Sequence, residues 1–354
     1  MTGRGIDQIL AYPCAPRICE EYCKSALDYI TLAERVNGPI KTPVAWDYIW
    51  GEALDELSRR KPDARIVNLE TAVTSSGAPE PKGINYRMNP ANIAALTVAR
   101  LDACVLSNNH VLDWGVGGLL DTLEAVRGAG IRTAGAGRNL AEASAPAIIQ
   151  VTPSCRVLVF GLGLDTSGIP PFWAATQHRP GVNFLCDLSQ ETAQALASEV
   201  LSRRQPGDIA VISIHWGSNW DYYIAPEQED FAHALIDLGA CDILHGHSSH
   251  HARAIEIYRR KLILYGCGDF INDYEGIREH DEFRGDLLPM YLANIDECDG
   301  TLDTLEIILF KMRRFRLTRA PRQDVQWFQS RMNDVSSPTA RLSTAADGSL
   351  MLTS

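Results

Sequence analysis

The sequence predicts an α/β fold, built on one mixed sheet or as a mixed two-sheet α/β sandwich flanked by helices. Through the middle of the chain, short apolar runs alternate with stretches of helical length, which is typical of βαβ units. After Asp242 the pattern changes to four apolar runs joined by short turns, which indicates an antiparallel part. The two patterns together predict parallel and antiparallel strands within one fold.

The expected elements follow from local signals. Asn89 and Pro90 are typical of an N-cap and a first helical residue, Gly128 of a helix end, and Ser189 of another N-cap. We therefore expect helices that begin at residue 89 and that cover residues 116–128, 188–204 and 226–238. Apolar and β-branched runs predict strands at residues 65–68, 103–107, 131–134, 156–162, 209–214, 254–258, 261–265, 287–295 and 302–310.

The C-terminal segment has weaker signals. Beyond residue 320 only residues 325–332 have a helical pattern, and residues 336–354 are rich in Ser, Thr and Ala. We expect such a polar end to be frayed. The sequence therefore predicts one domain over residues 1–320, followed by a short helix and a flexible tail over residues 321–354.

Composition excludes some classes of function. With 354 residues and 45% apolar content the chain can bury a large core. A net charge of −11 argues against nucleic-acid or anionic-membrane binding, although a bound metal could still attract an anionic substrate. No apolar stretch is long enough for a membrane span, and the first residues lack a signal-peptide core. The nine cysteines are typical of small buried side chains in a reducing compartment, so we expect a cytoplasmic chain unless a signal precedes it.

Four polar clusters follow strand-like runs, and they are the main functional signal. In open α/β sheets, ligands bind at the carboxyl ends of the strands, so we expect these clusters to form one metal site. The candidate ligands are Glu70, Asn109, His215, His247 and His250. Taken singly, Glu70 is better explained as a solvated or capping carboxylate, and His215 as a structural histidine. Four histidines within seven residues, from 245 to 251, are harder to explain as a surface loop.

Two candidate catalytic residues lie in the second cluster. His110 can act as acid or base, and Asp113, three residues later, can hold its tautomer. The alternative is a turn followed by a helix capped by Asp113. Arg4 is a third candidate, since it could position an anionic substrate. The glycine-bracketed turn at residues 266–273 is expected to line the site.

In this order, the clusters resemble the motifs of the CapA-type family, which is named for poly-γ-glutamate capsule synthesis and is related to the calcineurin-like metallophosphoesterases. The resemblance runs from residue 1 to about residue 310. It implies a calcineurin-like metallophosphoesterase fold. It is carried by Asn68-Leu69-Glu70-Thr71, by Asn108-Asn109-His110 with Asp113, by His215-Trp216-Gly217, by Gly246-His247 with His250, and by Gly268-Asp269-Phe270.

The chain departs from the family pattern at three places. Ser248 stands where the family usually has a histidine, and Asp269 where it has an asparagine. The aspartate of the family's first motif is missing, because the sequence starts just after its expected position. We therefore expect an upstream strand ending in Gly-Asp, with a one-metal variant as the alternative.

The resemblance also implies a metal content. One divalent ion would take Glu70, Asn109, His215 and His247, whereas a second would keep only Glu70 and His250. We expect one or two ions of Mn, Fe or Zn.

Three functions are compatible with these parts. The first is a metal-dependent hydrolase or transferase that acts on a phosphoester or on a γ-glutamyl or peptide amide, in poly-γ-glutamate or capsule metabolism. The second is a metal-assisted peptide epimerase in which His110 moves a proton at the α-carbon. The third is a non-catalytic accessory subunit of a polymer-synthesis complex. The expected partner is a small-molecule, polymer or peptide substrate, and not a nucleic acid.

Overall fold

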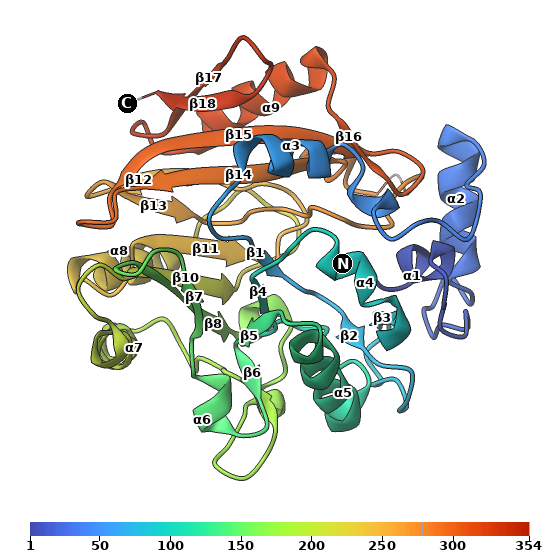
Figure 1. Ribbon diagram of the computed structural model, residues 1–354, viewed down its shortest axis with the longest axis horizontal. Coiled ribbons are helices and arrows are strands. Elements are labelled where there is room, and N and C mark those ends of the chain that lie inside the picture. The colour runs from blue at the N-terminus through green and yellow to red at the C-terminus, as the bar shows by residue number, and fades with distance from the viewer. Residues whose placement is uncertain (278, 354) are drawn as a thin grey trace.

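The computed structural model describes residues 1–277 and 279–353 and has a mixed α/β fold in which two sheets face each other (Figure 1). The first sheet has the order β1-β4-β5 and is parallel. The second has the order β12-β13-β11-β10-β8-β7, with a parallel centre and the antiparallel strands β12 and β7 at its edges. The strands are β1 Ile66–Asn68, β4 Ala103–Val105, β5 Arg132–Ala134, β7 Ala147–Gln150, β8 Arg156–Gly163, β10 Ile209–His215, β11 Ile243–His247, β12 Ile255–Tyr258 and β13 Lys261–Leu264.

The two sheets pack closely through small and branched side chains. Val105 of β4 and Val159 of β8 are fully buried in the shared cluster. A Cβ atom on Gly161 would lie 2.7 Å from the Cα of Gly135, which itself has a φ of +84°. Glycine is therefore required on both sides of this contact, which brings the ends of β4 and β8 together.

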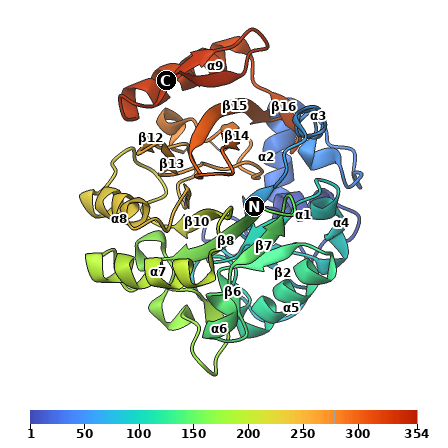
Figure 2. The same ribbon diagram turned by 60° about the vertical axis from the view of Figure 1, so that its left-hand side comes forward.

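Helices cover the outer faces of both sheets. The second sheet packs on α7 Gln190–Arg203 and α8 Pro226–Asp237 (Figure 2), and the first on α4 Ala94–Thr97 and α5 Gly115–Gly128. Alternation along β10 turns Ala210, Ile212 and Ile214 toward the helices. Because neighbouring side chains on a strand point to opposite faces, Ser213 and His215 lie on the inner face.

The expected caps are present at the helix starts. The side chain of Asn89 accepts a hydrogen bond from the Ala91 amide at the start of a 3₁₀ turn, Pro90–Asn92, that leads into α4. The Ser189 hydroxyl accepts one from the Thr192 amide at the start of α7. Local capping chemistry therefore predicts these two helix starts correctly.

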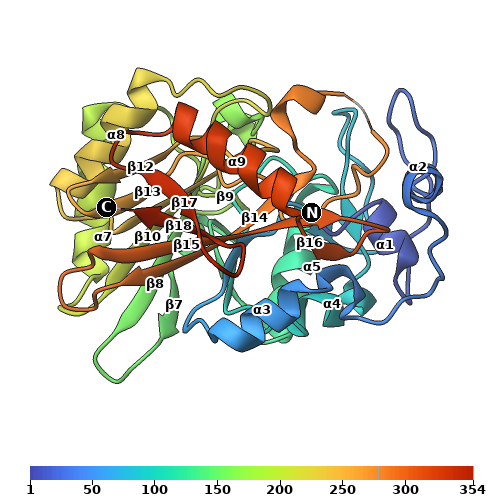
Figure 3. The same cartoon turned by 90° about the horizontal axis from the view of Figure 1, so that it is seen from above.

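A third sheet with the order β14-β15-β18-β17 lies beyond β12 and β13, with β16 paired to β15. The helix α9 lies across this sheet (Figure 3) and buries Val325, Phe328 and Met332 in the same apolar cluster as Leu305. The bounds are β14 Leu287–Ile295, β15 Leu302–Met312, β16 Leu317–Arg319, α9 Arg322–Val335, β17 Arg341–Thr344 and β18 Leu350–Thr353.

The prediction of a frayed tail was wrong. Residues 341–353 form the hairpin of β17 and β18, and β18 pairs with β15. Leu342 and Leu350 are almost fully buried, and Asp347-Gly348 supplies the turn between the strands. The Asp-Gly pair is a hairpin signal that the polar composition of the segment obscures. Ser354, the last residue of the expected tail, lies outside the described residues.

The first 60 residues contain helices that the sequence did not predict, namely α1 Gly5–Ile9, α2 Leu27–Asn37 and α3 Ala53–Arg60. Short elements also connect the main strands: β2 Ala72–Val73 with β3 Arg87–Met88, β6 Ala136–Gly137 with β9 Gly181–Val182, and α6 Leu140–Ala143. Within the described ranges, no helix is long and apolar enough to cross a membrane.

Candidate metal centre

Three of the expected ligands contact one another at the ends of β10 and β11 and in the loop after β4. The Nε2 atom of His215 lies 3.2 Å from Oδ1 of Asn109, and its Nδ1 lies 2.7 Å from Nδ1 of His247. Burial lowers the pKa of His215 and of His247 well below the usual value, with neighbouring histidines adding to the effect. Both imidazoles are therefore neutral and keep a lone pair, which is the form that binds a metal.

Ser213 extends this group toward a further histidine. Its Oγ lies 3.0 Å from Nε2 of His247 and 2.8 Å from Nδ1 of His245. Burial lowers the pKa of His245 to about 4. The sequence analysis did not single out either residue, although they precede His215 and His247 by two positions, so strand alternation places them on the same face.

The remaining expected ligands lie in a second group. His250 Nδ1 is 3.1 Å from Oδ1 of Asp269, and Glu70 Oε1 is 3.9 Å from Nε2 of His110. Burial raises the pKa of Glu70 and opposes protonation of His250, but Asp269 and Glu70 outweigh burial and raise the pKa of His250. In this group the carboxylates and His250 act on one another, whereas the first group contains no carboxylate.

Two amides orient the carboxylates of the second group. Asn68 donates to Oε2 of Glu70 at 2.9 Å, and Asn272 donates to Oδ2 of Asp269 at 2.9 Å. As expected, the turn at residues 266–273 lines the site. Asp269 departs from the family pattern, and it places a carboxylate in contact with His250.

The expected contact between His110 and Asp113 is present. Nδ1 of His110 lies 2.6 Å from Oδ2 of Asp113, which also accepts the Tyr86 amide proton at 2.6 Å. Lys82, which the sequence analysis missed, lies 2.7 Å from the other oxygen of Asp113 and donates to the carbonyl of Asn109. Burial raises the pKa of Asp113 to about 7, with Lys82 opposing.

His110 remains neutral in this setting. Burial lowers its pKa well below the usual value, and the cations of Lys82 and His250 act in the same direction. Because Nδ1 faces Asp113, the atom that faces Glu70 and the site is Nε2. His110 is therefore oriented so that Nε2 can take up or give a proton.

Arg4 is buried and its charge is already balanced. The guanidinium is 2% exposed, donates to both oxygens of Asp273 at 2.6 and 3.1 Å, and contacts Glu20 at 2.9 Å. Its Cζ lies 3.9 Å from the centre of the Tyr29 ring. This geometry favours a structural role and does not support the expectation that Arg4 holds an anionic substrate.

Two tyrosines connect the Arg4 network to the site. The Tyr86 ring lies 4.0 Å from that of His110 and the Tyr274 ring 5.3 Å from that of His250, measured between centroids. Their hydroxyls are 3.1 Å apart, and the guanidinium of Arg4 lies over Tyr86. The two rings therefore form a wall that holds both site histidines.

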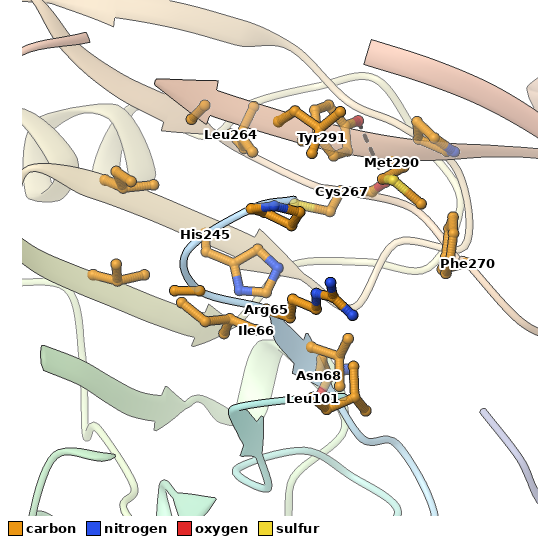
Figure 4. A pocket seen from close by; sticks show the side chains of 18 of the residues that line it. Arg65, Ile66, Asn68, Leu101, His245, Leu264, Cys267, Phe270, Met290 and Tyr291 are labelled. Atoms are coloured by element: carbon orange, nitrogen blue, oxygen red, sulfur yellow. Dashed lines mark hydrogen bonds between the residues drawn. The ribbon is translucent and has the colours of Figure 1, made fainter. Parts of the chain in front are cut away.

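His247 of the first group and the residues of the second group border one cavity of about 800 Å³, which extends between β1, β11 and β14. Its polar end is lined by Glu70, His247, His250 and Asp269, and its remainder mainly by apolar side chains. Figure 4 shows His245 in the middle of the cavity, with Ile66 and Asn68 of β1 on one side and Tyr291 of β14 on the other. The free edge of β1 faces this space, since β1 pairs only with β4 among the described strands.

The donor set fits a transition metal at one position. Asn109, His215 and His247 offer neutral oxygen and nitrogen atoms that are already in contact, which suits Mn, Fe or Zn. Over residues 1–277 and 279–353, no three carboxylate, imidazole or thiol ligand atoms of this site lie within 4.8 Å of one another. As placed, Glu70 and His250 therefore do not complete that set.

Several known proteins are similar in sequence to this chain. A family model described as bacterial capsule synthesis protein PGA_cap matches residues 1–274. A probable polyglutamine synthesis accessory protein of Mycobacterium tuberculosis is 47% identical over 95% of this chain and 89% of its own length. The capsule biosynthesis protein CapA of Bacillus anthracis is 29% identical over 56% of this chain and 47% of its own length. The PGA biosynthesis protein CapA of Bacillus subtilis is 30% identical over 56% and 50%, respectively.

Proposed function

The chain belongs to the PGA_cap family of bacterial capsule synthesis proteins, as its motifs predicted, and within that family we propose that it is a metal-dependent hydrolase or transferase. The observation that carries the proposal is the buried contact of Asn109, His215 and His247 beside the oriented pair of His110 and Asp113. A structural role alone would not require so many neutral, mutually facing donors next to a cavity.

The proposed substrate is a phosphoester or a γ-glutamyl or peptide amide of poly-γ-glutamate or capsule metabolism. The names of the relatives support this class of polymer. We also propose that the fold is of the calcineurin-like metallophosphoesterase type, which the facing mixed sheets and the position of the site at the strand ends support.

Asn109, His215 and His247 would hold one divalent ion together with Glu70, and Glu70 and His250 would be the ligands left for a second ion. A bound ion would lower the pKa of a water molecule and polarise the scissile group.

The chain's own residues would move the protons. Asp113 holds Nδ1 of His110, so Nε2 accepts a proton from the attacking water and returns it to the leaving group. Lys82, 2.7 Å from Asp113, lowers the pKa of this carboxylate against the opposing effect of burial. The Tyr86 ring packs against the His110 imidazole and limits its rotation.

The test is metal content and turnover of the purified chain. We expect stoichiometric Mn, Fe or Zn by elemental analysis, and hydrolysis of a generic phosphodiester or of a γ-glutamyl amide. His110→Ala should retain the metal and lose about 100-fold or more in kcat, because general acid–base catalysis contributes 10²–10⁴-fold. His178→Ala is the matched control, since His178 is exposed. Turnover of His110→Ala equal to that of the unaltered chain would reject the proposed role.

An accessory, non-catalytic role is the second candidate. It is favoured by the name of the Mycobacterium tuberculosis relative, an accessory protein, and by the separation of Glu70 and His250 from the other three donors. A chain that binds no stoichiometric metal and turns over neither substrate would establish this alternative over the enzyme.

A further inference from the structure

A second cluster of metal-ligating side chains lies outside the site described above. Glu229 and His233 of α8 and Glu256 of β12 each offer one ligand atom, and these three atoms lie within 4.8 Å of one another. Glu229 and His233 are four residues apart, so they lie on the same face of the helix. Among the described residues, this is the one group of three His, Cys, Asp or Glu ligands that meets this distance.

The imidazole of His233 is held in position by a stacked ring. The rings of His233 and Tyr258 are 3.8 Å apart between centroids and inclined by only 10°. Nε2 of His233 points to Oε1 of Glu256 at 3.0 Å, and its side chain is 22% exposed. The nitrogen therefore has a fixed direction and remains reachable from solvent.

The position of the Glu256 carboxylate is fixed by a hydrogen bond from a buried tyrosine hydroxyl. Tyr265, which is 3% exposed, donates to Oε2 of Glu256 at 2.7 Å. The Tyr265 ring stacks on that of Trp216 with an angle of 13°, which fixes the hydroxyl in turn. Such a hydrogen bond to the distal oxygen is the usual support for a carboxylate that binds a metal through its other oxygen.

Glu229 is the exposed member of the set. Its carboxylate is exposed and has no hydrogen bond or ion pair with any residue that the structure describes. It can therefore turn toward the other two groups without losing a partner. Arg259, whose guanidinium lies over the Tyr258 ring, is paired with Asp237 at 2.8 Å.

From this geometry we propose that Glu229, His233 and Glu256 form an accessory binding site for one divalent transition metal, with Zn²⁺ as the preferred ion. One imidazole and two carboxylates, with a water molecule as fourth ligand, match the ligand types and number that zinc takes. Zinc bound there would join α8 to β12 and stabilise the helix side of the second sheet. This site is independent of the proposed function.

The experiment measures zinc binding by the full chain. Equilibrium dialysis against buffered Zn²⁺ should show one more equivalent bound to the unaltered chain than to Glu229→Gln or His233→Asn. Glu227→Gln, an exposed glutamate on the same helix, is the control and should bind like the unaltered chain. Tyr265→Phe keeps all three ligands and should weaken this equivalent by about 10-fold or more, because it removes the support of Glu256.

A thermal measurement adds a second readout. Zinc should raise the melting temperature of the unaltered chain more than that of His233→Asn, since a ligand that binds only the folded state stabilises it. Both variants alter partly or fully exposed side chains, so circular dichroism should show an unchanged fold. Equal zinc stoichiometry in the unaltered chain, Glu229→Gln and His233→Asn would overturn the proposal and leave only a hydrogen bond between His233 and Glu256.

Discussion

At the scale of the residue, the chemistry around the site depends on which charges are already paired. The guanidinium of Arg4 lies between Asp273 and Glu20, both completely buried. Lys82 and Asp113 are paired in the same way, but Lys82 remains 24% exposed and lies beside His110. The Arg4 network therefore supports the tyrosine wall of the site, whereas the pair of Lys82 and Asp113 contacts His110, the proposed proton-transfer residue.

The Arg4 network predicts a large effect on stability. Arg4→Met would leave Asp273 and Glu20 buried without their cation, which typically costs about 3–5 kcal/mol. Urea unfolding measures this loss. Arg138→Met is the control, because Arg138 is 61% exposed and lies 3.8 Å from Glu142, a surface pair worth about 0–1 kcal/mol. Similar losses for the two variants would show that the Arg4 network does not stabilise the fold.

Lys82 predicts a change in pH dependence. Its charge lowers the pKa of both Asp113 and His110, so Lys82→Met should raise both values. The turnover–pH profile, where it depends on the ionisation of His110 and Asp113, should then move to higher pH. The exposed Lys41→Met is the control. A profile that moves to lower pH, or does not move, would contradict the proposed coupling.

At the scale of the element, ion pairs at the strand starts join neighbouring strands. Asp208, just before β10, accepts a hydrogen bond at 2.8 Å from Arg156 at the start of β8. It also accepts the Gln205 amide proton at 2.7 Å. Burial raises the pKa of Asp208, but these bonds and the charge of Arg204 outweigh burial and lower it.

A lowered pKa gives a defined pH window. The contribution of Asp208 is present above the unfolded pKa of about 3.9 and is lost as pH falls through the lower folded value. Asp208→Asn should therefore cost about 1–2 kcal/mol in the free energy of unfolding at pH 7 and progressively less below about pH 4. Chemical denaturation over this pH range measures the difference. The exposed Asp303→Asn should show no such trend, and a constant loss for Asp208→Asn at all pH values would reject the argument.

Element boundaries follow from local signals where those signals are strong. The long apolar runs of β8 and β10, and the caps Asn89 and Ser189, predict their elements well. The hairpin of β17 and β18 depends instead on pairing with β15, which lies about 40 residues earlier in the sequence. A polar segment forms a strand there because it pairs with β15 and buries Leu342 and Leu350 in the cluster that contains α9.

At the scale of the whole molecule, the C-terminal hairpin closes the third sheet. Leu350 is fully buried in the cluster that also contains Ile255 of β12 and Val325 of α9. Leu350→Ala should lower the free energy of unfolding by about 2–5 kcal/mol, the range for buried leucines. Leu201→Ala, at a leucine that is 46% exposed, is the control and should cost less than about 1 kcal/mol. Equal losses of unfolding free energy in the two variants would show that burial of Leu350 in the hairpin does not stabilise the fold.

The sequence by itself determined the alternation of strands and helices, the family, and the strand ends that carry Glu70, Asn109, His215 and His247. These follow from periodicity and from short motifs, which are local. The tertiary structure alone decided which of these residues meet, and it divided them into a group of neutral donors and a group that contains the carboxylates. It also placed Lys82 on Asp113 and paired Arg4 with Asp273, 269 residues away. Such contacts depend on how the sheets pack, because burial and distance set the charge of a side chain, and neither is encoded by its neighbours in sequence.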